Sequence, residues 1–243
     1  MPVYRLDLAY DGSGFSGYAR QKGQRTVQGE LEGALEKLLG AEPKTAVAGR
    51  TDAGVHARNQ VVSLTIDDPV NPGEMLPSLN SMLGPEIAVN RMTEADADFH
   101  ARFSAKWRRY RYTLDCGATA DPMHRHRAWH VGASLDWGKV EAATSPLLGE
   151  HDFSSFCRSV EGRSNVRVVD EAVWEEVSGF RYFWIRANSF CHQMVRSIVG
   201  HLYDLGRGFA DPGSTHEVIE ARDRSRVATV APPHGLTLWE VGY

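Results

Sequence analysis

Strand-like and helix-like patterns are mixed in both halves of this 243-residue chain, and this mixture limits the possible folds more than any other feature. Residues 3–10 alternate in polarity with a period of two, which predicts a strand. Thr26 can cap a helix over residues 27–39, where apolar side chains recur at helical spacing before Gly40 ends it. Further strands are expected at residues 44–48, 60–66, 87–92, 106–115, 171–177, 180–188 and 237–241. Further helices are expected directly after Asn71-Pro72 and at residues 137–147, 192–205 and 215–223.

The order of these elements favours an α+β fold, because strands and helices do not alternate strictly as they do in a parallel α/β sheet. The second half repeats the style of the first. We therefore expect two similar subdomains, residues 1–104 and 105–243, each with a mixed or antiparallel sheet and flanking helices.

Composition excludes several classes of protein. A hydrophobic content of 42% with 24% charged residues is ordinary for a globular protein. No segment predicts a signal peptide or a membrane span. The three cysteines, Cys116, Cys157 and Cys191, are far apart and form no C-x-x-C pair, which argues against a disulfide framework and against a thiolate zinc site. We expect a location in the reducing cytosol.

Basic residues are concentrated in two places although the net charge is -4. A run between residues 99 and 114 holds five cations and no acid, and a second cluster spans residues 124–127. Such patches can contact phosphates whatever the total charge, although most charge runs are solvated surfaces. The cations are Arg102, Lys106, Arg108, Arg109 and Arg111 in the run, and His124, Arg125, His126 and Arg127 in the cluster.

Residues 48–57, Ala-Gly-Arg-Thr-Asp-Ala-Gly-Val-His-Ala, concentrate unusual chemistry in a loop between two expected strands. Two glycines allow a sharp turn and a close approach to a ligand, and Arg50, Thr51, Asp52 and His56 supply charge and hydrogen bonds. By local chemistry alone, Asp52 is a structural turn residue, because aspartate commonly bonds its own turn backbone. His56 alone is a hydrogen-bonded loop residue.

The run Gly49 to Ala57 resembles the signature loop of the tRNA pseudouridine synthase A family. Other blocks resemble that family in the same order, so the similarity spans nearly the whole chain. These blocks are Tyr10-Asp11-Gly12, Val27 to Leu31, Asp98 to Ala105, Arg109-Tyr110-Arg111-Tyr112 and His192 to Gly200.

The resemblance implies that Asp52 is the catalytic nucleophile. Conversion of uridine to pseudouridine breaks the bond between ribose C1′ and uracil N1, turns the base and rejoins it through C5. A carboxylate can add to C1′ or to uracil C6, so one aspartate suffices and neither a metal nor another cofactor is expected. The residues do not choose between the two routes.

The resemblance also implies roles for Tyr110, Arg196 and Arg50. An ionised Asp52 needs a nearby cation, which Arg196 would supply from the edge of an apolar helix face. Tyr110 would stack on the extruded uracil and assist proton removal. Arg50 would support the flipped nucleotide, and Thr51 and His56 would shape the loop. Without the resemblance, Arg196 is an exposed helix residue and Tyr110 a core aromatic.

Family membership further implies the pseudouridine synthase fold, with an active-site cleft between the two subdomains. The expected substrate is uridine at positions 38, 39 and 40 in the anticodon stem-loop of tRNA, flipped out of its stack. The expected protein is a cytoplasmic homodimer that does not bind membranes. The sequence departs from the family pattern at residues 18–21, where members often carry tryptophan, and this makes RNA contacts near Arg20 less secure. It also departs at Gln193, where a second histidine is common.

Two other classes of function remain open at this stage. One is a carboxylate- or metal-dependent hydrolase that uses Asp52, His56 and His192, although their spacing matches no strong ligand motif. The other is a non-catalytic RNA-binding module built on the strand from Arg108 to Tyr112. An essential metal would favour the first, and binding without a modified nucleoside would favour the second.

Overall fold

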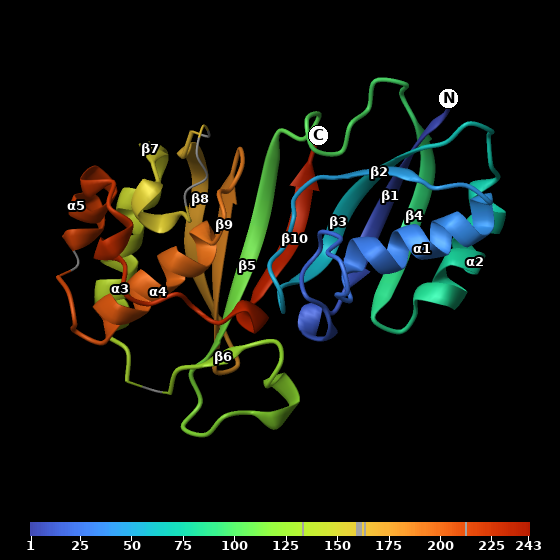
Figure 1. The fold of residues 1–243 in the computed structure, drawn as a ribbon. Coiled ribbons are helices and arrows are strands. Elements are labelled where there is room, and N and C mark those ends of the chain that lie inside the picture. Colours follow the sequence, from blue (N-terminus) through green and yellow to red (C-terminus); the bar gives the residue numbers. More distant parts are fainter. Residues whose placement is uncertain (133, 159–161, 163, 212) are drawn as a thin grey trace. The chain divides into compact units, whose positions relative to one another are not determined.

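The computed structural model describes residues 1–132, 134–158, 162, 164–211 and 213–243, which form two compact units (Figure 1). Unit 1 comprises Met1–Lys106 and Thr237–Tyr243, and unit 2 comprises Trp107–Leu236. The sequence assigned residues 237–243 to the second subdomain. In the structure these residues belong to unit 1, because the last strand pairs in parallel with a strand of that unit at Thr237–His56 and Leu238–Ala57.

Unit 1 is built on a sheet with the strand order β4–β1–β3–β10, and β2 pairs with β3. All its pairings are antiparallel except that of β10 with β3. Helices α1 and α2 cover one face of this sheet (Figure 1). The strands are β1 (Val3–Tyr10), β2 (Lys44–Val47), β3 (His56–Thr65), β4 (Ile87–Ala95) and β10 (Leu236–Gly242), and the helices are α1 (Val27–Leu39) and α2 (Pro72–Leu83).

The two helices of unit 1 begin where local chemistry predicts. Thr26 accepts a hydrogen bond from the Gly29 amide, and Gly40 ends α1 in the left-handed conformation with φ 68°. Asn71 caps α2, and Pro72 occupies its first turn. Leu31 and Leu35 of α1 are fully buried, so the apolar stripe of this helix forms part of the core.

Unit 2 is built on an antiparallel sheet with the strand order β5–β9–β8–β7, and β6 adds a short parallel pairing to β5. The indole rings of Trp137 on α3 and Trp174 on β8 pack 5.3 Å apart, and Trp174 Nε1 donates to Thr144 Oγ1. The strands are β5 (Trp107–Asp115), β6 (Trp129–His130), β7 (Gly149–Asp152), β8 (Val166–Val177) and β9 (Phe180–Ala187), and the helices are α3 (Trp137–Thr144), α4 (Met194–Gly206) and α5 (Ser214–Ala221).

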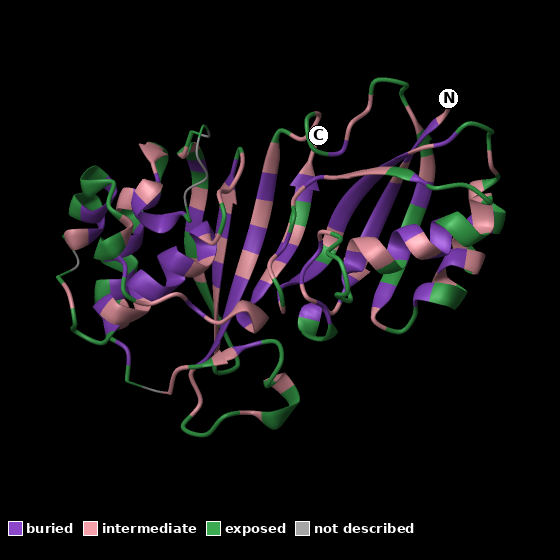
Figure 2. Cartoon of the chain, in the orientation of Figure 1, coloured by how far each residue is buried: buried purple, intermediate pink, exposed green. Residues whose placement is uncertain are grey.

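The expected α+β class with mostly antiparallel sheets and flanking helices is confirmed. Buried residues line the strands and the inner faces of the helices in each unit, whereas exposed residues concentrate in turns (Figure 2). No helix in the described part of the chain is long and apolar enough to cross a membrane.

The sequence argued against a disulfide framework, but the structure joins one pair of cysteines in the described part of the chain. Cys157 and Cys191 are joined in unit 2, with their Cα atoms 5.7 Å apart, and Cys116 is the free cysteine among the described residues. The two partners are 34 residues apart in sequence, and the fold brings them together where the backbone amide of Arg158 donates to the carbonyl of His192. Sequence spacing carries no information on such a long-range approach.

His201 on α4 is a buried titratable group of unit 2. Its side chain lies among apolar residues, 5% of the residue is exposed, and Nε2 lies 3.1 Å from Thr215 Oγ1. Burial lowers the pKa of the imidazole from 6.5 to about 4. Because the unfolded chain binds this proton more tightly, the neutral ring stabilises the fold above pH 6.5, and this contribution is lost as the pH falls towards 4.

Between pH 7 and pH 4, the unfolding free energy of the wild type should therefore fall by about 3 kcal/mol more than that of His201→Gln, as measured by urea unfolding. The exposed His216 on the neighbouring helix offers a matched control, and His216→Gln should follow the wild type. An equally steep acidic decline in His201→Gln would contradict the assignment.

Candidate active site

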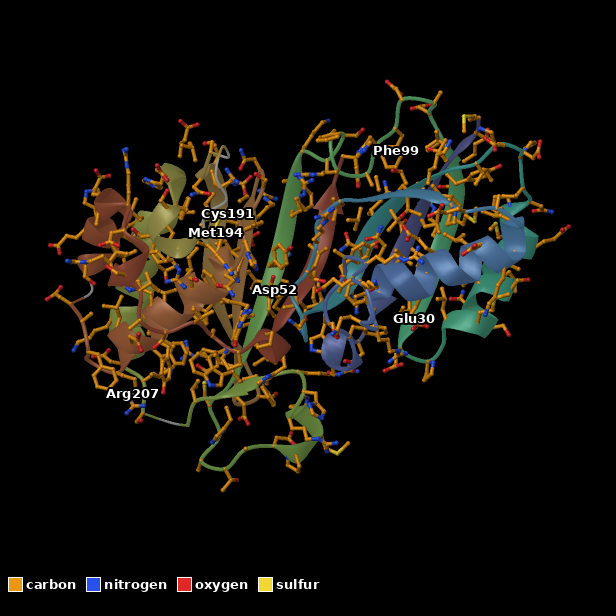
Figure 3. All side chains as sticks on the ribbon, viewed as in Figure 1. Glu30, Asp52, Phe99, Cys191, Met194 and Arg207 are labelled. Carbon is orange, nitrogen blue, oxygen red and sulfur yellow. A yellow bond between two sulfur atoms is a disulfide. The ribbon has the colours of Figure 1, made fainter. Side chains whose placement is uncertain are left out.

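Asp52 lies in the loop between β2 and β3 and is only partly buried (Figure 3). Its carbonyl oxygen accepts a hydrogen bond from the Val55 amide at 3.1 Å, which closes a tight turn. The neighbours Thr51, Val55 and His56 are 8%, 2% and 7% exposed. The loop therefore buries Thr51, Val55 and His56, while Asp52 is partly exposed and Ala53 is exposed.

A second segment, residues 10–18, holds the backbone of this loop. The Tyr18 amide donates to the Thr51 carbonyl at 3.0 Å, and the Gly12 amide donates to His56 Nδ1 at 3.1 Å. His56 Nδ1 also lies 3.2 Å from Asp11 Oδ1, so the imidazole is held by two residues of this segment. These contacts agree with the expectation that Thr51 and His56 shape the loop.

Gly12 makes the closest approach to the loop. A Cβ atom at this position would lie 2.1 Å from the Val55 carbonyl oxygen and 2.5 Å from its carbon. No side chain fits in that space, so the residue must be glycine while the turn after Asp52 keeps its place.

Two buried side chains also hold the loop, and one of them, Gln60, was not singled out by the sequence. Tyr10 Oη lies 2.8 Å from Thr51 Oγ1, and Gln60 Nε2 donates to the Gly49 carbonyl at 2.7 Å. One signal could have identified Gln60: it is a polar residue at an inward position of β3, paired with Leu8 and in line with Val62 and Leu64. Buried amides at such positions are usually hydrogen-bonded to a specific partner.

Arg50 is exposed and lies two residues before Asp52 in the same loop. Its positive charge acts on the buried hydroxyl of Tyr18. Burial raises the pKa of Tyr18 well above its ordinary value, and the Arg50 charge opposes that rise. Arg50 is therefore exposed to solvent while its charge acts on a buried hydroxyl next to the loop.

Tyr110 lies on β5, where burial alternates from Trp107 to Tyr112. Arg108, Tyr110 and Tyr112 are buried, while Trp107, Arg109 and Arg111 are half-buried; beyond Tyr112 both faces of the strand are buried. The Tyr110 ring packs edge-on against Phe190 with centroids 4.9 Å apart. This contact fixes the ring plane of Tyr110.

Arg196 lies in the first turn of α4, close to the labelled Met194 in the chain (Figure 3). Its Nε donates to the Ala231 carbonyl at 2.8 Å, and its own carbonyl accepts from the Ala231 amide at 3.0 Å. Its charge also acts on Tyr112, whose pKa is raised by burial and lowered by the guanidinium. Arg196 is therefore a partly buried, anchored cation and not a freely solvated one.

The basic residues between positions 99 and 114 differ in burial and in their contacts. Arg108 is buried and donates to the Asn188 carbonyl, Arg109 pairs with Glu171, and the Arg111 guanidinium lies 4.8 Å from the ring centroid of Tyr182. Arg102 and Lys106 are exposed. In the second cluster Arg125, His126 and Arg127 are exposed. The exposed residues can therefore reach a phosphate, whereas the buried Arg108 cannot.

The structure groups the site residues by unit. Arg50 and Asp52 belong to unit 1, and Tyr110 and Arg196 belong to unit 2. His56 of the hydrolase alternative lies in unit 1, and His192 lies in unit 2. Within the described residues, no group of three or more histidine, cysteine, aspartate or glutamate side chains is placed to hold a metal ion.

Comparison with known proteins gives a match over most of the chain. The family model described as tRNA pseudouridine synthase matches residues 8–104 and 143–243. A tRNA pseudouridine synthase A from Leifsonia xyli subsp. xyli is 41% identical over 99% of this chain and 91% of its own length. One from Brevibacillus brevis is 40% identical over 100% of both chains. Among solved structures, an H/ACA RNP bound to a substrate RNA aligns with 82% of this chain and 43% of its own at 13% identity and TM-score 0.36, too low to bear on the fold.

The contact between Gly12 and Val55 predicts the effect of a single methyl group. Gly12→Ala should lower the unfolding free energy by about 1–3 kcal/mol and reduce activity, because either the loop or residue 12 must move. Gly33→Ala in α1 is the matched control: nothing lies within 4 Å of its Cβ, so it should gain up to about 1 kcal/mol. Equal stability of the two variants in urea would contradict the close packing of the loop.

Proposed function

Because the chain belongs to the tRNA pseudouridine synthase family, we propose that Asp52 is the nucleophile with which it acts. The protein is an isomerase that converts uridine in tRNA to pseudouridine. The observation that carries the proposal is the position of the partly exposed Asp52 in a loop whose residues Thr51, Val55 and His56 are buried and hydrogen-bonded.

The chemistry requires a group that holds one half of the nucleotide while the other half turns. A carboxylate adds to ribose C1′ or to uracil C6 and later leaves, so a covalent aspartate intermediate connects the broken N1 bond to the new C5 bond. The C5 proton is then lost to a base and N1, freed from the ribose, takes up a proton, which restores the aromatic base. No atom is gained or lost overall, and the proposal includes no cofactor.

Tyr110 and Arg196 complete the proposed site. The proposal requires the Arg196 guanidinium to stabilise the ionised Asp52 and the Tyr110 ring to stack on the flipped uracil, in a cleft between the two subdomains. The fixed ring plane of Tyr110 and the anchored Nε of Arg196 support these roles, because both groups are held in one orientation before substrate arrives. The exposed guanidinium of Arg50 is assigned to support of the flipped nucleotide.

The proposed target is uridine at positions 38, 39 and 40 of the tRNA anticodon stem-loop, and the proposed location is the cytoplasm. Such a base must leave its stack at a cost of a few kcal/mol. The exposed Arg125 and Arg127 can contribute phosphate contacts that offset this cost.

Release of tritium from C5-labelled uridine in tRNA measures turnover. Asp52→Ala and Asp52→Asn should both reduce the single-turnover rate by at least about 10⁴-fold while tRNA binding persists. Asp68→Asn, at an exposed aspartate of the same unit, is the control and should keep the wild-type rate. Undiminished release by Asp52→Ala would eliminate Asp52 as the nucleophile.

We also propose a homodimer whose two basic surfaces form one groove for tRNA. Light scattering at the working concentration should give twice the chain mass of 27.0 kDa. A monomer with full activity at that concentration would refute the shared groove.

A further inference from the structure

A chain of three buried polar side chains lies beneath the Asp52 loop. Tyr10, Thr51 and Gln60 are 4%, 8% and 0% exposed. Tyr10 Oη lies 2.8 Å from Thr51 Oγ1 and 3.3 Å from Gln60 Nε2. Polar groups this deep cost free energy unless they are paired, so the chain of hydrogen bonds is a specific arrangement.

The chemistry of each group determines one of these directions. An amide nitrogen only donates, so Gln60 Nε2 donates to Tyr10 Oη. In the hydrogen bond between Tyr10 and Thr51, either hydroxyl can be the donor. Burial raises the pKa of Tyr10 to about 12, which keeps its hydroxyl protonated at neutral pH.

The same side chains hold the loop at Gly49 and Thr51, the two residues that flank Arg50 before Asp52. The Gln60 amide donates to the Gly49 carbonyl at 2.7 Å and accepts from the Gly49 amide at 3.4 Å. Thr51 is held through its hydroxyl by Tyr10 and through its carbonyl by the Tyr18 amide. With Thr51 fixed at two points, the Cα of the next residue, Asp52, has little freedom.

A register shift in the β1–β3 pairing brings these groups together. Leu8 pairs with Gln60, whereas Tyr10 pairs with Ala57, so β3 contains one extra residue between the two pairs. A bulge of this kind re-aims side chains at the end of a strand. Here it places Tyr10 opposite the end of the loop while Gln60 remains within hydrogen-bond reach of it.

We propose that Tyr10 and Gln60 are positioning residues of the isomerase, which hold Thr51 so that the adjacent Asp52 carboxylate is presented to the target nucleotide. This inference rests on the assignment of Asp52 as the nucleophile. Covalent attack needs reacting atoms about 3–3.5 Å apart in the correct orientation, so a displacement of about 1 Å can cost on the order of 10²-fold in rate.

The experiment compares Tyr10→Phe, Thr51→Val and Thr51→Ser by single-turnover tritium release at saturating tRNA and by KM. Tyr10→Phe removes the phenol hydroxyl and Thr51→Val replaces the threonine hydroxyl by an isosteric methyl, so each should reduce kcat by roughly 10–100-fold with KM changed less than about 3-fold. Thr51→Ser retains the hydroxyl and should remain within about 3-fold of the wild type. The double variant should be no slower than Tyr10→Phe, because that change already removes the hydrogen bond between Tyr10 and Thr51.

Tyr4→Phe is the matched control on the same strand. Tyr4 is 2% exposed, and its hydroxyl donates to the Val70 carbonyl and accepts from the Val70 amide. Its loss costs a similar buried hydrogen bond away from the Asp52 loop. Tyr4→Phe should be destabilised in urea like Tyr10→Phe but keep the wild-type kcat.

The outcomes separate this inference from the assignment of the nucleophile. The inference is supported by slow Tyr10→Phe and Thr51→Val with active Thr51→Ser and Tyr4→Phe. Wild-type kcat in Tyr10→Phe and Thr51→Val, or an equal loss in Tyr4→Phe, would overturn it. If Asp52→Asn is inactive in the same assay while Tyr10→Phe has the wild-type kcat, only the positioning role fails. If Asp52→Asn is active, the nucleophile assignment fails first.

Discussion

The hydrogen bonds that join residues 10–18 to the loop before β3 are the constraint on which the site depends. Within the loop, the Val55 amide donates to the Asp52 carbonyl and closes a turn. Its place is determined by the pairing of β1 with β3, which brings Tyr10 opposite Ala57 and lets Gly12 pack against Val55. A catalytic carboxylate on a loop gains precision when the adjacent sheet fixes the backbone on both sides of it.

The residues of unit 2 that we assign to the site are held by contacts within that unit. The hydroxyl of the fully buried Tyr112 donates to the Pro232 carbonyl, and Tyr110 on the same face packs against Phe190. Arg196 is tied to Ala231 through both its side chain and its backbone. The interactions of Arg108 and Arg109 with groups of their own sheet show that part of the basic sequence run serves the fold. We assign the phosphate contacts to exposed cations elsewhere.

The fold was predictable from sequence where its determinants are local. The strand Val3–Tyr10 and the helix Val27–Leu39 follow from residue periodicity and from Thr26 and Gly40 at the helix ends. The short strand Gly149–Asp152 was missed, because it depends on pairing with β8 and carries little pattern of its own. The Cys157–Cys191 bond was missed for a similar reason.

The candidate site was harder to predict from local sequence patterns than the fold. Asp52 in isolation is a turn residue, and its assignment depends on the ordered resemblance along the chain. Gln60 follows a strand pattern and Tyr10 lies in one of the resembling blocks, but their contacts with the loop become visible only from the register of β1 and β3. Polar side chains inside a sheet are informative because burial forces them to find partners, and those partners are visible only in three dimensions.

The most direct measurement is a crystal structure of Asp52→Asn bound to tRNA. The assignment of the nucleophile predicts a uridine flipped out of its stack, with ribose C1′ or uracil C6 about 3–3.5 Å from the side chain at position 52. Tyr110 should stack on the base and Arg196 should lie beside position 52. A flipped uridine bound with its C1′ and C6 atoms away from position 52, next to another nucleophilic side chain, would contradict the central claim.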